Sequence, residues 1–261
     1  MNKLNGTIAI LLFVLSGHTI IAQTDVLALR VNQDRIERRI HELAQFGRDS
    51  TGHGYRVAYT SGDIAGRAWY MEQMSQAGLD VSIDAAGNLV GKRAGMNPGL
   101  KPIAFGSHID MVPDGGNYDG CVGSISALEV MDVLKENNLK TNHPLEILIF
   151  SNEEGATYGS SFMAGHLHSE VLNNVSQSGL NLYDGIKAIG GDPDHIQNAV
   201  RQKGDLAAFL ELHIEQGAFL ERDQIQIGVV SGIVGILQWD VTITGMANHA
   251  GTTPMNLRHD A

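Results

Sequence analysis

Two short apolar runs separated by an amphipathic segment constrain the fold of this chain more than any other feature. Residues 102–105 and 145–150 have the length and apolar content of strands buried in a sheet that is covered on both faces. Residues 122–139, between them, carry apolar side chains near helical spacing and predict a helix that connects the strands. Strand, helix and strand in this order predict a βαβ unit and therefore an α/β fold.

The segments before this unit predict two helices followed by a pair of strands. Apolar residues near helical spacing indicate the helices, and short apolar runs on either side of a turn indicate the strands. The predicted helices span 26–46 and 64–77, the second with Asp63 as its cap and Gly78 as its stop, and the predicted strands span 81–83 and 89–90.

The composition favours a globular protein and argues against nucleic acid as a partner. With 261 residues, of which 43% are hydrophobic, the chain can bury a core for one full domain and part of another. Its formal net charge of -11, without a stripe of Lys and Arg, does not suit a phosphate backbone. We therefore expect no nucleic-acid partner.

The first 22 residues resemble a secretory signal peptide. Lys3 supplies a positive start, residues 8–15 are an unbroken apolar run, and Ala22 is a small residue before a possible cleavage site. A buried helix or a membrane anchor is the alternative, but the run is shorter than the roughly 20 apolar residues of a spanning helix. We expect a periplasmic or secreted protein with no membrane span once residues 1–22 are removed.

Polar residues follow the apolar runs at the places where an α/β sheet binds ligands. His108 and the pair Glu153 and Glu154 each come after one strand of the βαβ unit. His213 lies in 209–215, which we predict to be a third strand. Because ligands bind beyond the carboxyl ends of the strands in open α/β sheets, we expect these segments to converge on one edge.

His108, Asp110 and Asp119 form the first candidate metal site. The glycine-rich turn 115–120 allows the loop after His108 to fold tightly, and histidine with carboxylates binds hard or borderline metal ions. Asp110 can accept the imidazole N–H and thereby orient the ring. Alone, His108 would be an ordinary polar residue and Asp119 could simply stabilise a turn, but the pairing favours a ligand role. Cys121, the only cysteine, is better interpreted as a small buried spacer than as a nucleophile.

Glu153 and Glu154 are harder to explain without a functional role. Adjacent carboxylates at the end of a strand repel each other and point to opposite sides, so one can ligate a metal ion while the other faces a bound water. A solvated surface turn, which Gly155 permits, is the alternative. His213 by itself is more simply a core histidine.

Five separated motifs together resemble a known family. They are Gly106-Ser107-His108-x-Asp110, Tyr118-Asp119-Gly120, Asn152-Glu153-Glu154-Gly155, Leu212-His213-Ile214-Glu215-Gln216-Gly217 and Asn248-His249-Ala250-Gly251-Thr252-Thr253-Pro254-Met255. In this order they resemble the M20-type metallohydrolases, from roughly Asn32 to the last residue. The chain is most similar to their branch of N-carbamoyl-L-amino-acid hydrolases, allantoate amidohydrolases and β-ureidopropionases, because the last two motifs point there rather than to general peptidases.

The resemblance implies a mixed-sheet, zinc-hydrolase-like catalytic domain with an inserted α+β lid that also mediates dimerisation. It implies two divalent metal ions, zinc or manganese, as cofactors. His108 and His213 would each bind one ion, and Asp119 would bridge both. Glu154 would bind the ion that His213 does not hold.

The resemblance also implies the remaining site residues. Glu153 would be the general base that takes a proton from the attacking water and returns it to the leaving nitrogen. Asp110 would assist catalysis by orienting its histidine, and Gln216 and His249 would contact the substrate. The chain departs from the family at Met111, where serine is frequent, and at 157–158, where Arg-Phe is frequent, so substrate specificity could differ there.

The function that the resemblance implies is a metal-dependent amidohydrolase. Its substrate would be a small molecule, an N-carbamoyl-L-amino acid or an allantoate-type ureido acid, cleaved at a linear C–N bond. The alternatives are an aminoacylase or dipeptidase and an inactive metal-binding fragment. A homodimer is expected for the full-length protein.

The domain organisation is expected to follow the family. Residues 25–229 would form the N-terminal part of the catalytic domain and residues 230–261 the start of the lid. Within the lid, residues 238–244 predict a strand and residues 254–261 the start of a helix. The rest of the lid and the last metal-binding histidine are expected beyond Ala261.

Overall fold

The structure of the chain is a computed structural model that describes residues 29–235, 237 and 239–261. The predicted signal peptide, residues 1–22, lies outside the described residues, as does the start of the first predicted helix. The chain divides into two compact units, Met1–Gln216 and Gly217–Ala261. Among the described residues, no helix is both long and apolar enough to cross a bilayer.

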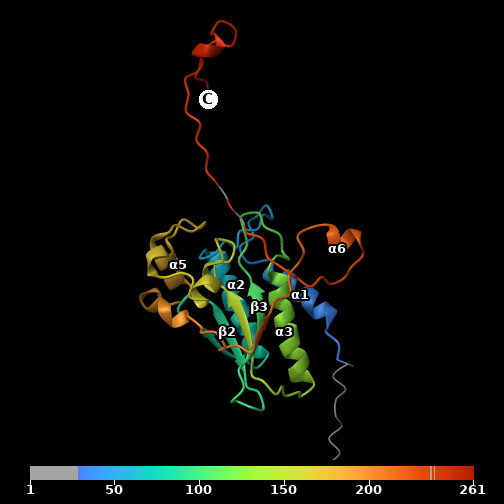
Figure 1. Cartoon of the computed structure of the whole chain (residues 1–261). Helices are drawn as coiled ribbons and strands as arrows, with labels where there is room; N and C mark the ends of the chain where they lie inside the picture. Colours follow the sequence, from blue (N-terminus) through green and yellow to red (C-terminus); the bar gives the residue numbers. More distant parts are fainter. Residues whose placement is uncertain (1–28, 236, 238) are drawn as a thin grey trace, which may run out of the picture. The chain divides into compact units, whose positions relative to one another are not determined.

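A five-stranded mixed sheet forms the centre of the first unit (Figure 1). Its strands are β1 (Asp80–Ile83), β2 (Leu89–Arg93), β3 (Ile103–His108), β4 (Leu145–Phe150) and β5 (Ala208–Leu210), in the spatial order β1-β2-β4-β3-β5. Strands β1, β2 and β4 pair antiparallel, whereas β4, β3 and β5 run parallel. The parallel strands bring their carboxyl ends to one edge, and the predicted α/β fold with a mixed sheet is confirmed.

Helix α3 (Cys121–Glu136) connects β3 to β4 and completes the predicted βαβ unit. Its apolar stripe, which includes Leu128, is buried in the main core, the hydrophobic cluster that also contains Leu43, Tyr70 and Ile147. The helix ends earlier than predicted because Asn138 adopts a left-handed conformation, with φ 52°, and the N–H of Leu139 donates to the carbonyl of Leu134 at 2.9 Å. This local structure satisfies carbonyl groups that the last turn would otherwise leave without donors.

Helices α1 (Gln33–Leu43) and α2 (Ser61–Gln76) pack in the same core as α3. Helix α1 begins later than the predicted position because Asn32 caps it. The side-chain oxygen of Asn32 accepts a hydrogen bond from the N–H of Arg35 at 3.0 Å, which is typical of an N-cap.

The N-cap of α2 is Thr60, so the prediction that Asp63 caps this helix is wrong. Asp63 lies in the first turn, and its carboxylate accepts a hydrogen bond from the N–H of Tyr59 at 2.8 Å. The hydroxyl of Thr60 accepts one from the N–H of Asp63 at 3.4 Å, so the polar groups of this turn satisfy each other. Gly78, with φ 88°, follows the helix as predicted.

Strand β4 is buried on both faces, as the apolar run predicts. Ile147 and Ile149 pack with the helices in the main core. Leu148 packs on the opposite face, with Val90 and Met163. A strand in this position is held rigidly, which fixes the direction in which the chain leaves it at Phe150.

Residues 158–200 form a group of short helices that the sequence did not predict. They are α4 (Tyr158–Met163), η2 (Ser169–Asn173), α5 (Leu182–Ala188) and η3 (Pro193–Ala199). Their buried side chains form a core of their own, which includes Tyr59 and Ala86 from outside the segment. This second core anchors the chain that follows Glu153 and Glu154.

The second unit contains little regular structure. It holds α6 (Phe219–Arg222), η4 (Met255–Leu257) and an isolated bridge between Met246 and His259. The predicted helix over 254–261 is wrong, because only a single 3-10 turn forms there and one turn does not sustain an α-helix. The predicted strand over 238–244 is also wrong for residues 239–244, which pair with no strand among the described residues; Gln238 lies outside them.

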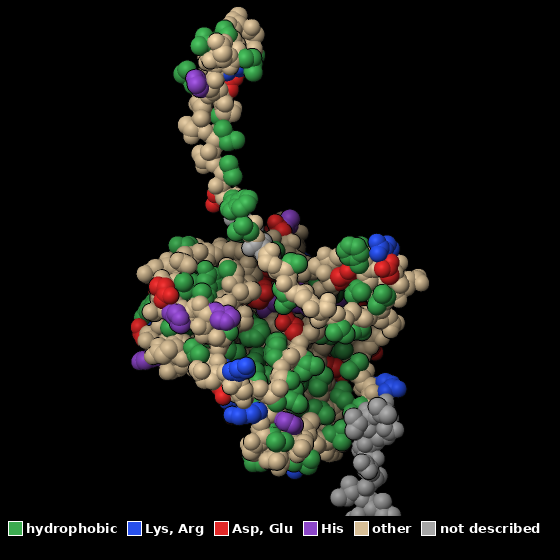
Figure 2. Space-filling view, in the orientation of Figure 1, with side chains coloured by type: hydrophobic (Ala, Val, Ile, Leu, Met, Phe, Trp, Pro, Cys, Tyr) green, Lys and Arg blue, Asp and Glu red, His purple; other side chains and the backbone are tan. Residues whose placement is uncertain are grey.

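An apolar pocket of about 290 Å³ is lined by residues of β3, α3 and the segment at 210–212. Its lining includes Phe105, Ala127, Leu210 and Leu212. Figure 2 shows hydrophobic side chains, in green, gathered over α3. Because no histidine or carboxylate lines this pocket, it is not the predicted metal site.

Candidate metal centre

His108 is the last residue of β3, and the fold holds it from several sides. Its carbonyl accepts a hydrogen bond from the hydroxyl of Ser124 on α3 at 2.8 Å. Its ring Nδ1 lies 3.1 Å from the backbone oxygen of Asp110 and 3.6 Å from the carboxylate oxygen Oδ1 of the same residue. The imidazole is buried, and this arrangement leaves Nε2 as the ring nitrogen that faces the other candidate ligands.

Gly120 is required where the loop meets α3. Its φ of 61° is in the left-handed region, and a Cβ at this position would lie 2.5 Å from Cε1 of the His108 ring. A larger residue would therefore strain the backbone and displace the imidazole. Besides allowing a tight loop, Gly120 thus leaves free the space that the imidazole of His108 occupies.

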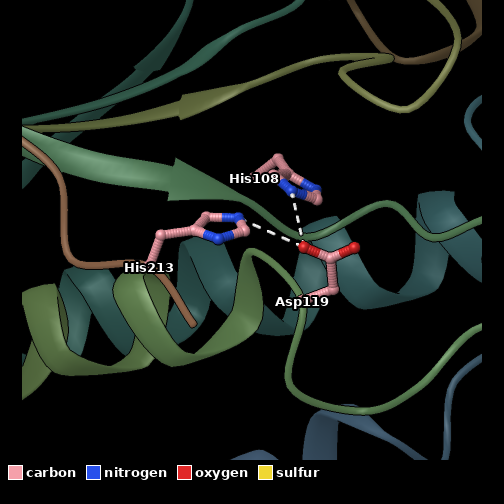
Figure 3. A group of neighbouring side chains, drawn as sticks. All are labelled: His108, Asp119 and His213. Carbon is pink, nitrogen blue, oxygen red and sulfur yellow. Dashed lines mark ion pairs between the residues drawn. The ribbon is translucent and has the colours of Figure 1, made fainter. Parts of the chain in front are cut away.

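Asp119 lies between two imidazoles (Figure 3). Its Oδ1 is 3.1 Å from Nε2 of His213 and 3.7 Å from Nε2 of His108. One ligand atom from each of the three residues lies within 4.8 Å of the others. The structure thus brings together three of the four predicted metal ligands around one carboxylate.

His213 reaches this position from outside the sheet. The third strand predicted over 209–215 forms only as the short β5, Ala208–Leu210; its extension over 211–215 is wrong, and His213 follows in irregular backbone. Two contacts guide the segment: the hydroxyl of Ser107 donates to the carboxylate of Glu211 at 2.6 Å, and α3 approaches so closely at Gly123 that a Cβ there would overlap the carbonyl of Leu212. A glycine is needed at this contact.

Glu153 and Glu154 lie in a turn after β4 rather than on the strand. The prediction that they point to opposite sides of a strand is therefore wrong, since β4 ends at Phe150. The Oε2 atom of Glu153 lies 3.5 Å from Nε2 of His108. The backbone N–H of Glu154 donates to Oδ2 of Asp110 at 3.1 Å. Asp110 consequently links the turn that carries Glu153 and Glu154 to the loop after His108.

The ionisable groups of the site perturb one another. Burial raises the pKa of Glu154 to about 7, and the charge of Asp119 adds to this effect. Burial also raises the pKa of Glu153. Burial lowers the pKa of His108, but the carboxylates of Asp110 and Glu153 outweigh it, so the pKa of His108 is raised overall. Crowded carboxylates of this kind are stabilised in their charged forms by a cation.

The donor set fits a divalent metal ion. Imidazole nitrogen and carboxylate oxygen are ligands that zinc and manganese accept. Oδ1 of Asp110 is buried and has no hydrogen-bond partner. Because this oxygen lies near Nδ1 of His108, a small rotation would let the imidazole N–H donate to it and fix the ring with Nε2 free for a metal ion.

Two residues were predicted to contact the substrate. Gln216 reaches the site, where its Nε2 donates a hydrogen bond to Oδ2 of Asp119 at 2.7 Å. His249 belongs to the second unit, and its Nδ1 accepts hydrogen bonds from the N–H groups of Gly251 and Thr252, each at 3.1 Å. The substrate-binding role of His249 stays a prediction.

The residues that support the ligands were not predicted from the sequence. Ser107, Ser124 and Glu211 position the ligands without binding a metal themselves. Ser107 and Glu211 lie next to or near a predicted ligand in sequence, which is the one signal that could have identified them. Cys121 is buried, and burial raises the pKa of its thiol, which agrees with a spacer rather than a nucleophile.

Comparison with known proteins places these observations in a family. Residues 104–260 match the family described as Peptidase family M20/M25/M40. The chain is 39% identical over 235 residues to an N-carbamoyl-L-amino acid amidohydrolase of Geobacillus stearothermophilus, covering 88% of this chain and 58% of that protein. It is 41% identical over 238 residues to one of Paenarthrobacter aurescens, covering 89% of this chain and again 58% of the relative.

A solved structure shares the fold. The chain aligns with a hydantoinase/carbamoylase family amidase from Burkholderia ambifaria with a TM-score of 0.73 and 33% sequence identity. The alignment covers 88% of this chain and 57% of the amidase. The chain therefore spans somewhat more than half the length of the proteins that it matches.

Proposed function

Since the chain belongs to peptidase family M20/M25/M40, we propose that it is part of a metal-dependent amidohydrolase that cleaves linear C–N bonds. The substrate would be an N-carbamoyl-L-amino acid or an allantoate-type ureido acid. The observation that best supports this proposal is the carboxylate of Asp119 between the imidazoles of His108 and His213, with Glu153 beside them. The names of the two similar amidohydrolases support the class of substrate.

The residues that would hold two divalent ions, zinc or manganese, are His108, His213, Asp119 and Glu154. Such ions act as Lewis acids toward a carbonyl group and make water more acidic. Asp119 is suited to a bridging role because both imidazole Nε2 atoms face the same carboxylate oxygen. Glu154, with its raised pKa, would become fully ionised on gaining a cation as neighbour.

Glu153 would move the proton. Its carboxylate would accept a proton from the attacking water, whose oxygen forms a bond to the carbonyl carbon. It would then give the proton to the nitrogen as the C–N bond breaks, so the amine leaves neutral. Burial raises the pKa of Glu153, which makes the group a better proton acceptor than a solvated glutamate. Asp110 would keep His108 oriented throughout.

Export and dimerisation belong to the same proposal. The pattern of a positive residue, an apolar run and small residues at 1–22 supports a periplasmic or secreted protein. The homodimer is proposed for the whole protein on the strength of family membership alone.

Hydrolysis assays on the metal-loaded chain test the proposal. We expect release of the free amino acid from an N-carbamoyl-L-amino acid, lost on chelation of the metal. Glu153→Gln should lower kcat by about 100- to 10,000-fold while metal binding persists. Glu170→Gln, which changes an exposed glutamate on η2, is the matched control and should behave like the wild type.

Three results would count against the proposal. Preferred cleavage of a dipeptide would replace the carbamoyl substrate by a peptidase or aminoacylase substrate. Full activity of Glu153→Gln would remove its role as the base. Metal binding without turnover of any of these substrates would leave this chain as a metal-binding fragment.

A further inference from the structure

Arg56 is a completely buried arginine in the loop between α1 and α2. It is among the largest side chains that the described part of the chain buries fully, and none of its surface is exposed. Burial of a charged group is costly unless it is paired or fully hydrogen-bonded, so its retention at this position calls for an explanation from its contacts.

The guanidinium of Arg56 donates hydrogen bonds to groups from three segments. Its Nε donates to the backbone oxygen of Ile109 at 2.6 Å, and its Nη2 to the sulfur of Cys121 at 3.3 Å. Its Nη1 donates to the backbone oxygens of Leu43 at 2.9 Å and Phe46 at 3.2 Å. Among the described residues, no carboxylate accepts a hydrogen bond from it. Its hydrogen-bond acceptors are three carbonyls and a thiol.

Two of these acceptors lie within the segments that deliver the candidate metal ligands. Ile109 lies between His108 and Asp110 in the sequence. Cys121 is the first residue of α3, and its N–H donates a hydrogen bond to the backbone oxygen of Asp119 at 2.5 Å. The backbone oxygen of Arg56 also accepts a hydrogen bond from the N–H of Met111 at 3.1 Å. Arg56 therefore contacts both the loop that carries His108 and Asp110 and the segment that follows Asp119, and it also bonds to the backbone at and just after the end of α1.

We propose that Arg56 is a positioning residue of the metal centre, which sets the spacing between the His108–Asp110 loop and the Asp119 loop. This inference rests on the proposed metal-dependent function. The planar guanidinium suits the task because its nitrogens are held in a rigid fork and reach several acceptors at once, which a lysine ammonium on a flexible stem cannot do. Its hydrogen bonds go to backbone oxygens and to the sulfur of Cys121, so Arg56 would act through the ligand loops rather than by binding the metal ion or the substrate itself.

A purely structural role is the alternative, in which Arg56 only joins α1 to the rest of the core. The two roles predict different results. A structural residue lowers stability when it is changed but leaves the geometry and affinity of a folded metal site intact. A positioning residue changes the site itself, even in a variant that is fully folded.

Cobalt binding to the full chain separates these roles, because the visible absorption of bound Co²⁺ reports coordination geometry independently of turnover. We would titrate the wild type, Arg56→Lys and Arg56→Gln, and record the thermal midpoint of each metal-free protein. Arg39→Gln is the matched control, since Arg39 is a buried arginine whose side chain pairs with Asp132 at 2.6 Å and donates to Gln73 at 3.1 Å, neither of which belongs to the site. Both Arg56 variants should bind Co²⁺ about 10- to 100-fold more weakly, with an altered spectrum at saturation. Arg39→Gln should lose stability but keep the wild-type affinity and spectrum.

Unchanged affinity and spectrum in a folded Arg56 variant would overturn the positioning role. If neither variant folds, Cys121→Ala decides, because it removes one acceptor and leaves the guanidinium in place. A Co²⁺ affinity lowered by about two- to tenfold in that variant supports the proposal, and an unchanged affinity overturns it. Failure of the wild type to bind Co²⁺ would instead overturn the proposed function, and the positioning role with it.

Discussion

Replacing Gly120 by alanine should damage the metal centre by a route that can be worked out from the structure. The backbone at this position has a φ of 61°, and the added methyl group would lie 2.5 Å from Cε1 of His108. Carbon atoms in contact normally lie about 3.5 Å apart, so the imidazole must move by about 1 Å. Metal–ligand distances tolerate errors of only about 0.2 Å, so a shift of this size removes His108 as an effective ligand.

The same substitution also strains the backbone. Holding a non-glycine residue at this φ costs about 1 to 3 kcal/mol of folding free energy. We therefore expect Gly120→Ala to lower both the free energy of unfolding and the affinity for zinc. Loss of orientation in a metal ligand typically lowers metal affinity by about 10- to 100-fold, and displacement of the ring should reach at least that range.

A second glycine in the same turn provides the control. Gly116 is exposed, its φ lies outside the left-handed region, and an added Cβ would meet no atom within 4 Å. Gly116→Ala should therefore keep the zinc affinity and leave stability unchanged or raised by up to about 1 kcal/mol. Urea unfolding and calorimetric zinc titration of the two variants measure both effects. Wild-type zinc affinity in Gly120→Ala would refute the reasoning.

Three further substitutions or conditions have defined outcomes. Arg39→Gln breaks the buried pair with Asp132, 2.6 Å long, and should lower the free energy of unfolding by about 3 to 5 kcal/mol in urea, whereas a loss below about 1 kcal/mol would show that the pair contributes little. Burial raises the pKa of Asp63 to about 6, although Arg67 opposes the shift, so the folded state holds a proton that the unfolded state releases. The contribution of Asp63 to stability is thus present below pH 3.8 and lost as the pH rises through 6; Asp63→Asn should lack this loss, and parallel pH profiles of the two proteins would contradict the assignment. Zinc at about 100 times its Kd should stabilise the wild type by about 2.7 kcal/mol, read as a rise in Tm, and His213→Ala should lose most of this rise; an equal rise in the variant would exclude His213 as a ligand.

The sequence predicts the centre of the fold well because strong apolar patterns dictate it. The run that becomes β4 is buried on both faces, the run that becomes β3 is buried or half-buried throughout, and the helix between them has a continuous apolar stripe, so burial leaves few alternatives. The same logic predicts the place of His108, at the carboxyl end of a parallel strand. It does not predict where β5 ends: the strand expected over 209–215 stops at Leu210, where its pairing with β3 ends.

The supporting residues of the site could not be predicted for a different physical reason. Arg56 bonds to carbonyl oxygens and a sulfur, and any residue supplies a carbonyl, so no spacing of residue types reveals such contacts. Aspartate is a residue type that often caps helices, but Asp63 lies in the first turn of α2 and Thr60 is the N-cap. The helices over 158–200 are too short to show a repeating apolar pattern in the sequence, and tertiary packing stabilises them instead.

The most direct test of the metal centre is the anomalous scattering of zinc in crystals of this chain grown with the ion. We predict two ions, one within about 2.0 to 2.2 Å of Nε2 of His108 and the other within the same distance of Nε2 of His213, each also bound by the carboxylate of Asp119. An ion held by other residues, or no ion at saturating zinc, would contradict this prediction.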